Sequence, residues 1–324
     1  MCNLTDPIFH NEDSARAHLE QIRWPNGPVC PFCGERDTVK ALGGKSMGPG
    51  WYHCSDCRKK FTVRVGTVYE RSKVALHKWL LATQMMASSK KGISAHQIHR
   101  TIGITYKTAW FMCHRIREAM RDDRAPGSDG MGGEGKTVEA DETYFGKVEN
   151  PSKVRKDGTP FLKSKAGRGP SNKRAVVALV ERGGNVRSFH VEKANRDTVA
   201  TILFENVSRE TVLYTDESRL YTLPGEQYAS HESVRHSADE YVRGSVHTNT
   251  IEGVFSIFKR GMRGVYQHCK EKHLHRYLAE FDFRYNNRER LGVNDAERRD
   301  NIVRAAEGKR LTYRRTAQFH GAAA

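Results

Sequence analysis

Three acidic residues in this 324-residue chain have the types and positions that suit metal-dependent phosphodiester chemistry. They are Asp141, Asp216 and Glu252, with 35 residues between the second and the third. This chemistry uses two divalent ions about 3.5–4 Å apart, one at the attacking oxygen and one at the leaving oxygen. Mg²⁺ and Mn²⁺ both bind carboxylate oxygens, so three carboxylates on rigid elements are a sufficient set of ligands.

Two predicted strands carry the first two acids. Asp141 lies in KTVEADETYFG, where apolar and polar residues alternate as in a half-buried strand, and Asp216 directly follows the apolar run TVLYT. An aspartate at the end of a strand often binds only the backbone of its own turn, which is the alternative for both residues. The agreement of three acidic positions favours the metal-binding interpretation.

A predicted helix, HTNTIEGVFSIFKRG, carries the third acid. At about 100° per residue, one apolar stripe forms from Ile251, Val254, Phe255 and Phe258. Glu252, Ser256 and Lys259 share a neighbouring face, which suits a metal ligand followed by a cation for a phosphate. The alternative is that Asn249 and Glu252 form a capping-box-like helix start and that Lys259 is a solvated charge.

The charge of the chain favours a polyanionic partner. Lys and Arg number 54 against 38 acidic residues, giving a formal charge of +16 and a pI near 9.6. Such a charge raises the rate of encounter with nucleic acid. There is no long apolar run, signal-peptide pattern or basic amphipathic anchor, so we expect no membrane partner and a cytoplasmic, nucleoid-associated protein.

Four of the seven cysteines form two CxxC pairs with twenty residues between them, Cys30 with Cys33 and Cys54 with Cys57. Each pair can place two thiolates about 2.3 Å from one tetrahedral Zn²⁺, so the spacing predicts a structural zinc ribbon. Two disulfides are the alternative, disfavoured in a basic chain without a secretion signal. His53 is not expected to be a ligand. Ordinary free thiols are expected at Cys2, Cys113 and Cys269.

Three helices are predicted after the ribbon, in LHKWLLATQMMASS, SAHQIHRTI and TYKTAWFMCHRIREAM. The last two are joined by a tight turn at Gly103, which is the helix-turn-helix pattern. The second helix of such a pair enters the major groove by its first residues, here Thr105, Tyr106, Lys107 and Thr108. A plain three-helix bundle without a nucleic-acid role is the alternative.

Composition and periodicity divide the chain into five regions. We predict a zinc ribbon with an N-terminal extension over 1–70, a helix-turn-helix region over 71–122 and a Gly-rich flexible linker over 123–136. An α/β catalytic domain over 137–290 and a C-terminal tail over 291–324 follow. Three antiparallel strands, a helical crossover, a further strand and a weaker strand around QYASHESV indicate a ribonuclease H-like mixed sheet. A basic insertion, 147–172, is predicted to be mobile in the free protein and to become ordered on DNA, with a solvated surface loop as the alternative.

The order of these motifs resembles the zinc-ribbon DDE transposases of the ISXO-like insertion-sequence group, over roughly residues 10 to 290. The motifs are CPFCG, HCSDCRKKFTVRVGT, KGISAHQIHRTIGITYKTAWFMCHRIREAM, VEADETYFGK, LYTDES and HTNTIEGVFSIFKRG.

The resemblance implies a ribonuclease H-like domain that cleaves double-stranded DNA at the terminal inverted repeats of a mobile element and joins the 3′ ends to target DNA. It implies catalytic acids at Asp141, Asp216 and Glu252, with Lys259 as the trailing cation. Relatives also use Asn as the third member, so Asn249 stays open as an alternative. The two ends of the mobile element must be brought together, so a homodimer or a higher assembly on DNA is expected. A DNA-binding regulator and a nuclease that does not join strands are the alternative functions.

Overall fold

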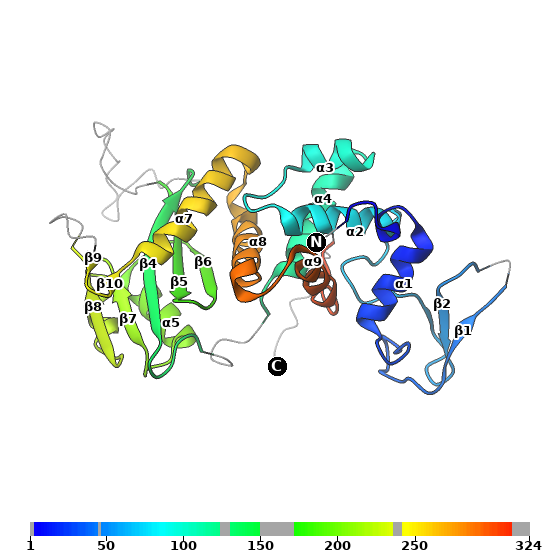
Figure 1. Cartoon of the computed structure of the whole chain (residues 1–324), viewed down its shortest axis with the longest axis horizontal. Helices are drawn as coiled ribbons and strands as arrows, with labels where there is room; N and C mark the ends of the chain where they lie inside the picture. Colours follow the sequence, from blue (N-terminus) through cyan, green and yellow to red (C-terminus); the bar gives the residue numbers. More distant parts are fainter. Residues whose placement is uncertain (1–2, 45–46, 124–129, 150–171, 236–241, 313–324) are drawn as a thin grey trace, which may run out of the picture. The chain divides into compact units, whose positions relative to one another are not determined.

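The computed structural model describes residues 3–44, 47–123, 130–149, 172–235 and 242–312. The chain divides into two compact units, Met1–Arg121 with Asn287–Ala324, and Asp122–Asn286. Both units are visible in Figure 1. The predicted basic insertion lies almost wholly outside the described residues.

The first unit contains the predicted ribbon. Helix α1 (Glu12–Arg23) precedes a three-stranded antiparallel sheet of β1 (Val39–Leu42), β2 (Trp51–Cys54) and β3 (Lys60–Phe61). Trp24 packs edge-on against Tyr52 and Phe61, with ring centroids 5.4 and 5.9 Å away. The alternating apolar and basic residues of RKKFTVRVGT, after the second cysteine pair, are typical of a strand, but only Lys60 and Phe61 of this segment pair with β2.

Helices fill the rest of this unit. The three predicted helices are present as α2 (Leu76–Ser88), α3 (Ala95–Ile102) and α4 (Tyr106–Met120). Gly103 ends α3 at φ +63°, a left-handed conformation that glycine adopts without a steric cost. Thr105 then caps α4, since its hydroxyl accepts a hydrogen bond from the Thr108 backbone N–H at 3.3 Å. The predicted helix-turn-helix geometry is therefore formed locally.

A helix also lies where a C-terminal tail was predicted. α9 (Asp295–Arg304) packs against α1, α2 and α4, and the short 3₁₀ turns η1 (Pro7–Phe9) and η5 (Glu289–Leu291) belong to the same unit. The Arg298 guanidinium donates to the Ala87 carbonyl oxygen at 3.1 Å and is almost fully buried. The described part of the tail therefore completes the helical core.

The second unit is built on a five-stranded mixed sheet. The strands are β4 (Thr137–Phe145), β5 (Arg174–Glu181), β6 (Val186–Val191), β7 (Val212–Thr215) and β8 (Ser230–Ser233), in the order β6-β5-β4-β7-β8. β6, β5 and β4 are antiparallel, and β4, β7 and β8 are parallel. The crossover to β7 contains α5 (Arg196–Asn206). The predicted ribonuclease H-like mixed sheet is confirmed by this strand order.

Short elements connect the sheet to two further helices. They are α6 (Thr222–Gly225), the hairpin β9 (Val242–Arg243) and β10 (Val246–His247), α7 (Asn249–Gly261), the π-helical turn η3 (Met262–Tyr266), η4 (Glu271–His273) and α8 (Leu274–Asn286).

Alternation along β4 sends its side chains to two different layers. Val138 and Ala140 pack with α5 in one cluster, while Phe145 packs toward Phe258 of α7 on the other face. α7 crosses that face in Figure 1. Glu139 and Asp141 alternate with Val138 and Ala140, so they lie on the α7 side.

A packed segment occupies residues 130–136, where a flexible linker was predicted. Met131 is buried and forms a bridge with Val207, and the Gly132 N–H donates to Glu181 Oε2 at 2.9 Å. A Cβ on Gly132 would lie 2.1 Å from Thr211 Oγ1, so glycine permits this close approach.

Helix α8 covers the open edge of the sheet. Ser188 on the edge strand β6 donates to the Asp282 carboxylate from its backbone N–H and from its hydroxyl, each at 2.7 Å. Asn286 exchanges two hydrogen bonds with the backbone of Val186, at 2.7 and 3.0 Å. Side chains of α8 thus take the place of a sixth strand, which protects the edge from pairing with another chain.

Asp282 should make the stability of the second unit depend on pH. Burial raises the pKa of its carboxyl from 3.8 to about 7. The folded state then holds a proton that the unfolded chain has lost, so the free energy of unfolding should fall as pH rises from about 4 to about 7. Asp282→Asn cannot ionise and should reduce this slope. Thermal midpoints with EDTA across this range test it; identical slopes for both proteins would rule Asp282 out as a source.

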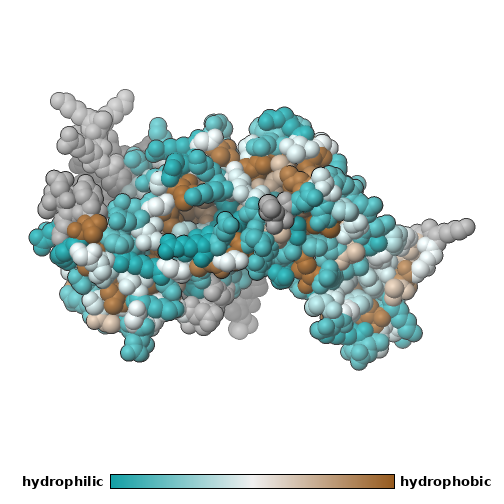
Figure 2. All heavy atoms as spheres, viewed as in Figure 1, coloured by the Kyte–Doolittle hydropathy of each residue, from teal (hydrophilic) through white to brown (hydrophobic). Residues whose placement is uncertain are grey.

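Hydrophilic residues predominate on the face shown in Figure 2, and its hydrophobic residues lie in small groups. Within the described parts of the chain, no helix is both long and apolar enough to cross a membrane.

Candidate active site and cysteine cluster

The register of the sheet brings the two predicted aspartates together. β4 and β7 run parallel with Ala140 opposite Thr215, so Asp141 and Asp216 occupy the next position of neighbouring strands. Each also has a local backbone contact: Asp141 Oδ1 accepts from the Glu142 N–H at 2.7 Å, and Asp216 Oδ1 accepts from the Ser218 N–H at 3.0 Å. Each aspartate therefore binds its local backbone, as the alternative interpretation expected, and the two carboxylates also lie side by side.

A third acid, Glu142, joins them. One carboxylate oxygen from each of Asp141, Glu142 and Asp216 lies within 4.8 Å of the others, a grouping that can hold a metal ion. Sequence reasoning missed Glu142, because neighbouring residues of a strand point to opposite faces. β7 ends at Thr215, so beyond Ala140 the strand β4 stays paired with β5 but has no strand between its two faces on the β7 side. The only local signal was the adjacent pair Asp141 and Glu142 within the predicted strand.

The acids carry a strong mutual repulsion. Burial, then the charges of Asp216 and Glu142, raise the pKa of Asp141 to about 8, and Glu252 adds to the same effect. Burial also raises the pKa of Glu142. Like charges this close resist ionising together, and a divalent cation relieves that cost. The donor set, all carboxylate oxygen, fits Mg²⁺ or Mn²⁺.

Helix α7 has the apolar stripe that was predicted, and Glu252 and Lys259 lie outside this stripe. Its apolar side is buried at Ile251, Val254, Phe255 and Phe258. Glu252 is exposed and accepts a hydrogen bond from the Thr248 hydroxyl at 3.4 Å. It lies outside the tight group of three acids, although its charge reaches Asp141. Burial lowers the pKa of Lys259, while the nearby Asp141 opposes that shift.

Asn249 does not cap this helix. α7 begins at Asn249, an exposed residue, and the N-cap is Thr248. The capping-box alternative, which needs Asn249 at the cap, is therefore not what the structure shows.

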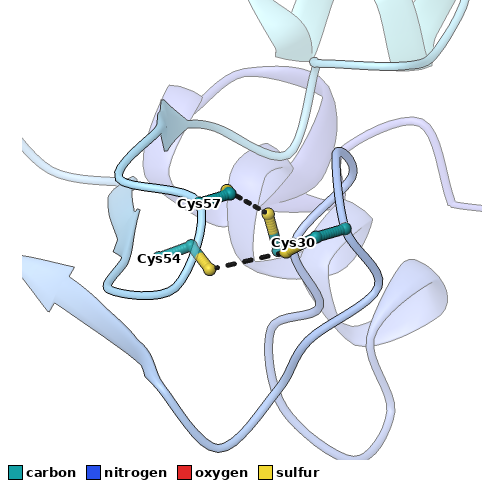
Figure 3. Close-up of side chains that lie close together, drawn as sticks. Cys30, Cys54 and Cys57 are labelled. Carbon is teal, nitrogen blue, oxygen red and sulfur yellow. Dashed lines mark hydrogen bonds between the residues drawn. The ribbon is translucent and has the colours of Figure 1, made fainter.

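The four paired cysteines converge on one point in the ribbon. The Sγ atoms of Cys30 and Cys57 are 3.5 Å apart, and those of Cys33 and Cys54 are 3.6 Å apart. Figure 3 shows the labelled sulfurs turned toward one another. Zn–S bonds of about 2.3 Å put the sulfurs of a tetrahedral site about 3.8 Å apart, so the cluster fits zinc. The cysteines are free thiols, and the disulfide alternative is wrong.

The other cysteines take no part in this cluster. Cys113 and Cys269 are buried thiols that form no disulfide with any described residue, as predicted. Cys2 lies outside the described residues.

The predicted groove-facing residues surround the start of α4. Thr105, Tyr106 and Lys107 are exposed, and Thr108 is half-buried. The Tyr106 ring stacks on His96 with centroids 4.1 Å apart. An open groove of about 720 Å³ adjoins this turn, lined by Lys73, Val74, His99, Arg100, Gly103, Ile104, Thr105 and Thr108.

Comparison with known proteins agrees with this architecture. The ISXO2-like transposase domain matches residues 132–286, and the transposase zinc-ribbon domain matches residues 10–60. An uncharacterized protein in transposable element ISH50 of Halobacterium salinarum is 33% identical over 286 residues, covering 85% of this chain and 91% of that protein.

Solved structures give weaker matches. A chain of the simian T-cell lymphotropic virus intasome, in complex with PP2A regulatory subunit B56 gamma, aligns with a TM-score of 0.28 at 14% identity, over 57% of this chain and 63% of that chain. A pre-cleavage Mos1 transpososome aligns with a TM-score of 0.26 at 10% identity, over 71% and 79%. At these TM-scores, the fold assignment rests on the strand order alone.

A ribonuclease H-like sheet with paired aspartates on its central strands, preceded by a four-cysteine ribbon, defines the DDE transposase class of enzyme. Within that class, the chain belongs to the ISXO2-like transposase family.

Proposed function

We propose that this transposase cleaves DNA at the ends of a mobile element and joins the freed 3′ ends to target DNA, with Asp141, Asp216 and Glu252 as ligands of two divalent ions. The observation that carries the proposal is the register that sets Asp141 beside Asp216 under α7. Glu142 would add charge on the side away from α7.

Two displacements would occur at this site. When bound, the ions would activate the attacking oxygen and stabilise the leaving oxygen. Water first attacks the phosphorus at the element end, and the 3′ oxygen leaves as a hydroxyl. That hydroxyl then attacks a target phosphodiester in line and displaces a target 3′ oxygen. Lys259 would contact a phosphate oxygen, and neither Tyr144 nor Ser256 is needed as a nucleophile.

The first unit would supply binding to DNA. Zn²⁺ held by the four paired cysteines would stabilise the ribbon, and the first residues of α4 would enter the major groove. Exposed Tyr106 and Lys107 and the charge of +16 support this role. Two ends have to be held together for joining, so a homodimer or a higher assembly on DNA is part of the proposal.

Strand joining is the decisive experiment. Purified protein is incubated with a labelled element end and a plasmid target in Mg²⁺. Labelled plasmid supports the proposal. Cleaved end without labelled plasmid indicates a nuclease that does not join strands, and bound but uncut end indicates a DNA-binding regulator.

Lys107→Ala should weaken binding to the element end and reduce the preference for it over random duplex. Loss of one phosphate contact should lower the slope of log affinity against log salt by about 1, and loss of a base contact should cost about 1–3 kcal/mol. Titrations of both duplexes at several salt concentrations measure this. Lys40→Ala, an exposed lysine on β1, is the charge-matched control. Wild-type preference and slope in the Lys107 variant would contradict the recognition-helix assignment.

A further inference from the structure

Glu139 is a charged residue in the core of the second unit that the proposed chemistry does not use. It lies on β4 two residues before Asp141, on the α7 side of the sheet, and is 0% exposed. Burying a carboxylate is costly unless charge partners and hydrogen bonds compensate for it. The groups that contact the Glu139 carboxylate therefore indicate the role of this residue.

Three donors surround this carboxylate, and two of them come from the first turn of α7. Arg182 Nε donates to Oε1 at 2.7 Å, and the Thr250 hydroxyl donates to the same oxygen at 2.8 Å. The Ile251 backbone N–H donates to Oε2 at 3.0 Å. The N-cap residue Thr248 makes no side-chain capping bond, so Glu139 caps the helix from a distant strand. A negative charge there also suits the helix dipole.

Arg182 extends the same network to the segment that leads into α7. Its guanidinium donates to the carbonyl oxygens of Ser245 and His247, each at 2.8 Å, and lies over the Tyr214 ring at 4.7 Å. Both the entry to α7 and its first turn are thereby tied to β4 and to the strand that precedes Asp216.

We propose that Glu139 is a positioning residue that holds the first turn of α7 so that Glu252 faces Asp141. Glu252 follows Ile251 directly, so the bond from Ile251 to Glu139 restrains the backbone that carries the third acid. This inference rests on the proposed function. Groups that orient metal ligands typically change metal affinity about 10–100-fold when they are replaced.

Glu139→Gln is the test variant. Arg182 and Ile251 donate to different oxygens of the carboxylate, so in the carboxamide one of these donors would face an N–H₂ group in place of an acceptor. The apolar stripe, Ile251 to Phe258, keeps α7 on the sheet, so the expected change is local fraying. Thr250→Val removes one of the three hydrogen bonds with little change of shape, and it serves as the milder second variant.

Asp282→Asn is the matched control. Asp282 also docks a helix onto this sheet through two hydrogen bonds. It does so at β6, an edge strand that pairs with neither β4 nor β7. A loss of stability alone should affect both variants, whereas a change at the metal site should affect only the Glu139 variant.

Three measurements are made on the full chain: Mn²⁺ affinity by electron paramagnetic resonance, hydrogen exchange of the amides in the first turn of α7, and the Mg²⁺ concentration for half-maximal cleavage. For Glu139→Gln we expect Mn²⁺ affinity about tenfold lower or more, faster exchange at Ile251, and a matching rise in the Mg²⁺ requirement. Thr250→Val should shift in the same direction by less, and Asp282→Asn should match wild type in all three.

Two results from the variants would overturn the inference: wild-type Mn²⁺ affinity in Glu139→Gln, or an equal loss of Mn²⁺ affinity in Asp282→Asn. Wild-type protein that binds Mn²⁺ without cleaving would refute the proposed function alone, because the Mn²⁺ and exchange measurements still decide the role of Glu139. Wild-type protein that binds no Mn²⁺ would overturn both.

Discussion

Asp141→Asn, Asp216→Asn and Glu252→Gln should each abolish cleavage and joining while leaving binding to the element end close to wild type. Each substitution keeps the shape of the side chain and removes the charge that divalent ions require. Rates should fall by about 10²–10³-fold or more, as they do when a group that stabilises the transition state is lost. Single-turnover cleavage of a labelled end, with binding measured in parallel, provides the test.

The choice of ion supplies a second check on the same site. Mn²⁺ accepts the same oxygen ligands and should support activity in the wild-type protein. Ca²⁺ is larger and more loosely coordinated, so it should permit end binding without turnover. Efficient cleavage in EDTA would contradict an ion-dependent mechanism.

Asn249 and Glu142 lie near the three proposed metal ligands, and substitutions at these two positions serve as comparisons for them. Asn249→Ala should lose activity only in part if Asn249 orients the start of α7, which is where the structure places it. Glu142→Gln should also lose only part of the activity, because Asp141 and Asp216 would remain. An active Glu252→Gln together with an inactive Asn249→Ala would mean that Asn249 is the third ligand.

Removal of zinc should unfold the ribbon before it affects the catalytic unit. Structural zinc contributes about 10–16 kcal/mol of apparent binding free energy, far more than the stability of a small three-stranded sheet. Cys54→Ser or a strong chelator should therefore release one zinc ion and expose the amides of residues 28–66 to hydrogen exchange. Metal analysis and exchange mass spectrometry measure the two effects.

Cys113→Ser is the matched control, since Cys113 is a buried cysteine outside the cluster. It should retain zinc and a protected ribbon. Zinc-free protein with a folded ribbon would refute the structural role of the metal.

Features encoded in short stretches of the chain were predicted from sequence. The two CxxC pairs identify the zinc-type cluster because two-residue spacing by itself brings two thiolates to one ion. The apolar periods of β4, β5 and α7 predict those elements, since alternation and helical spacing are local properties. Gly103 likewise predicts the turn between α3 and α4.

Where segments meet was decided by the tertiary structure. Glu142 joins Asp141 and Asp216 only because β7 ends at Thr215, and residues 130–136 pack only because a glycine lets them approach Thr211. α9 completes the helical core although its residues looked like a tail.

Glu139 is the clearest case. In sequence it is one polar position of an alternating strand, indistinguishable from a solvent-facing residue. Its partners Arg182, Thr250 and Ile251 are 43, 111 and 112 positions away. The sequence by itself determined the elements that carry the acids and which acids they carry. The register of β4 and β7 decided which carboxylates gather at the site, and the packing of α7 on the sheet decided which one holds the helix, because contacts between distant segments leave no periodic signal in the chain.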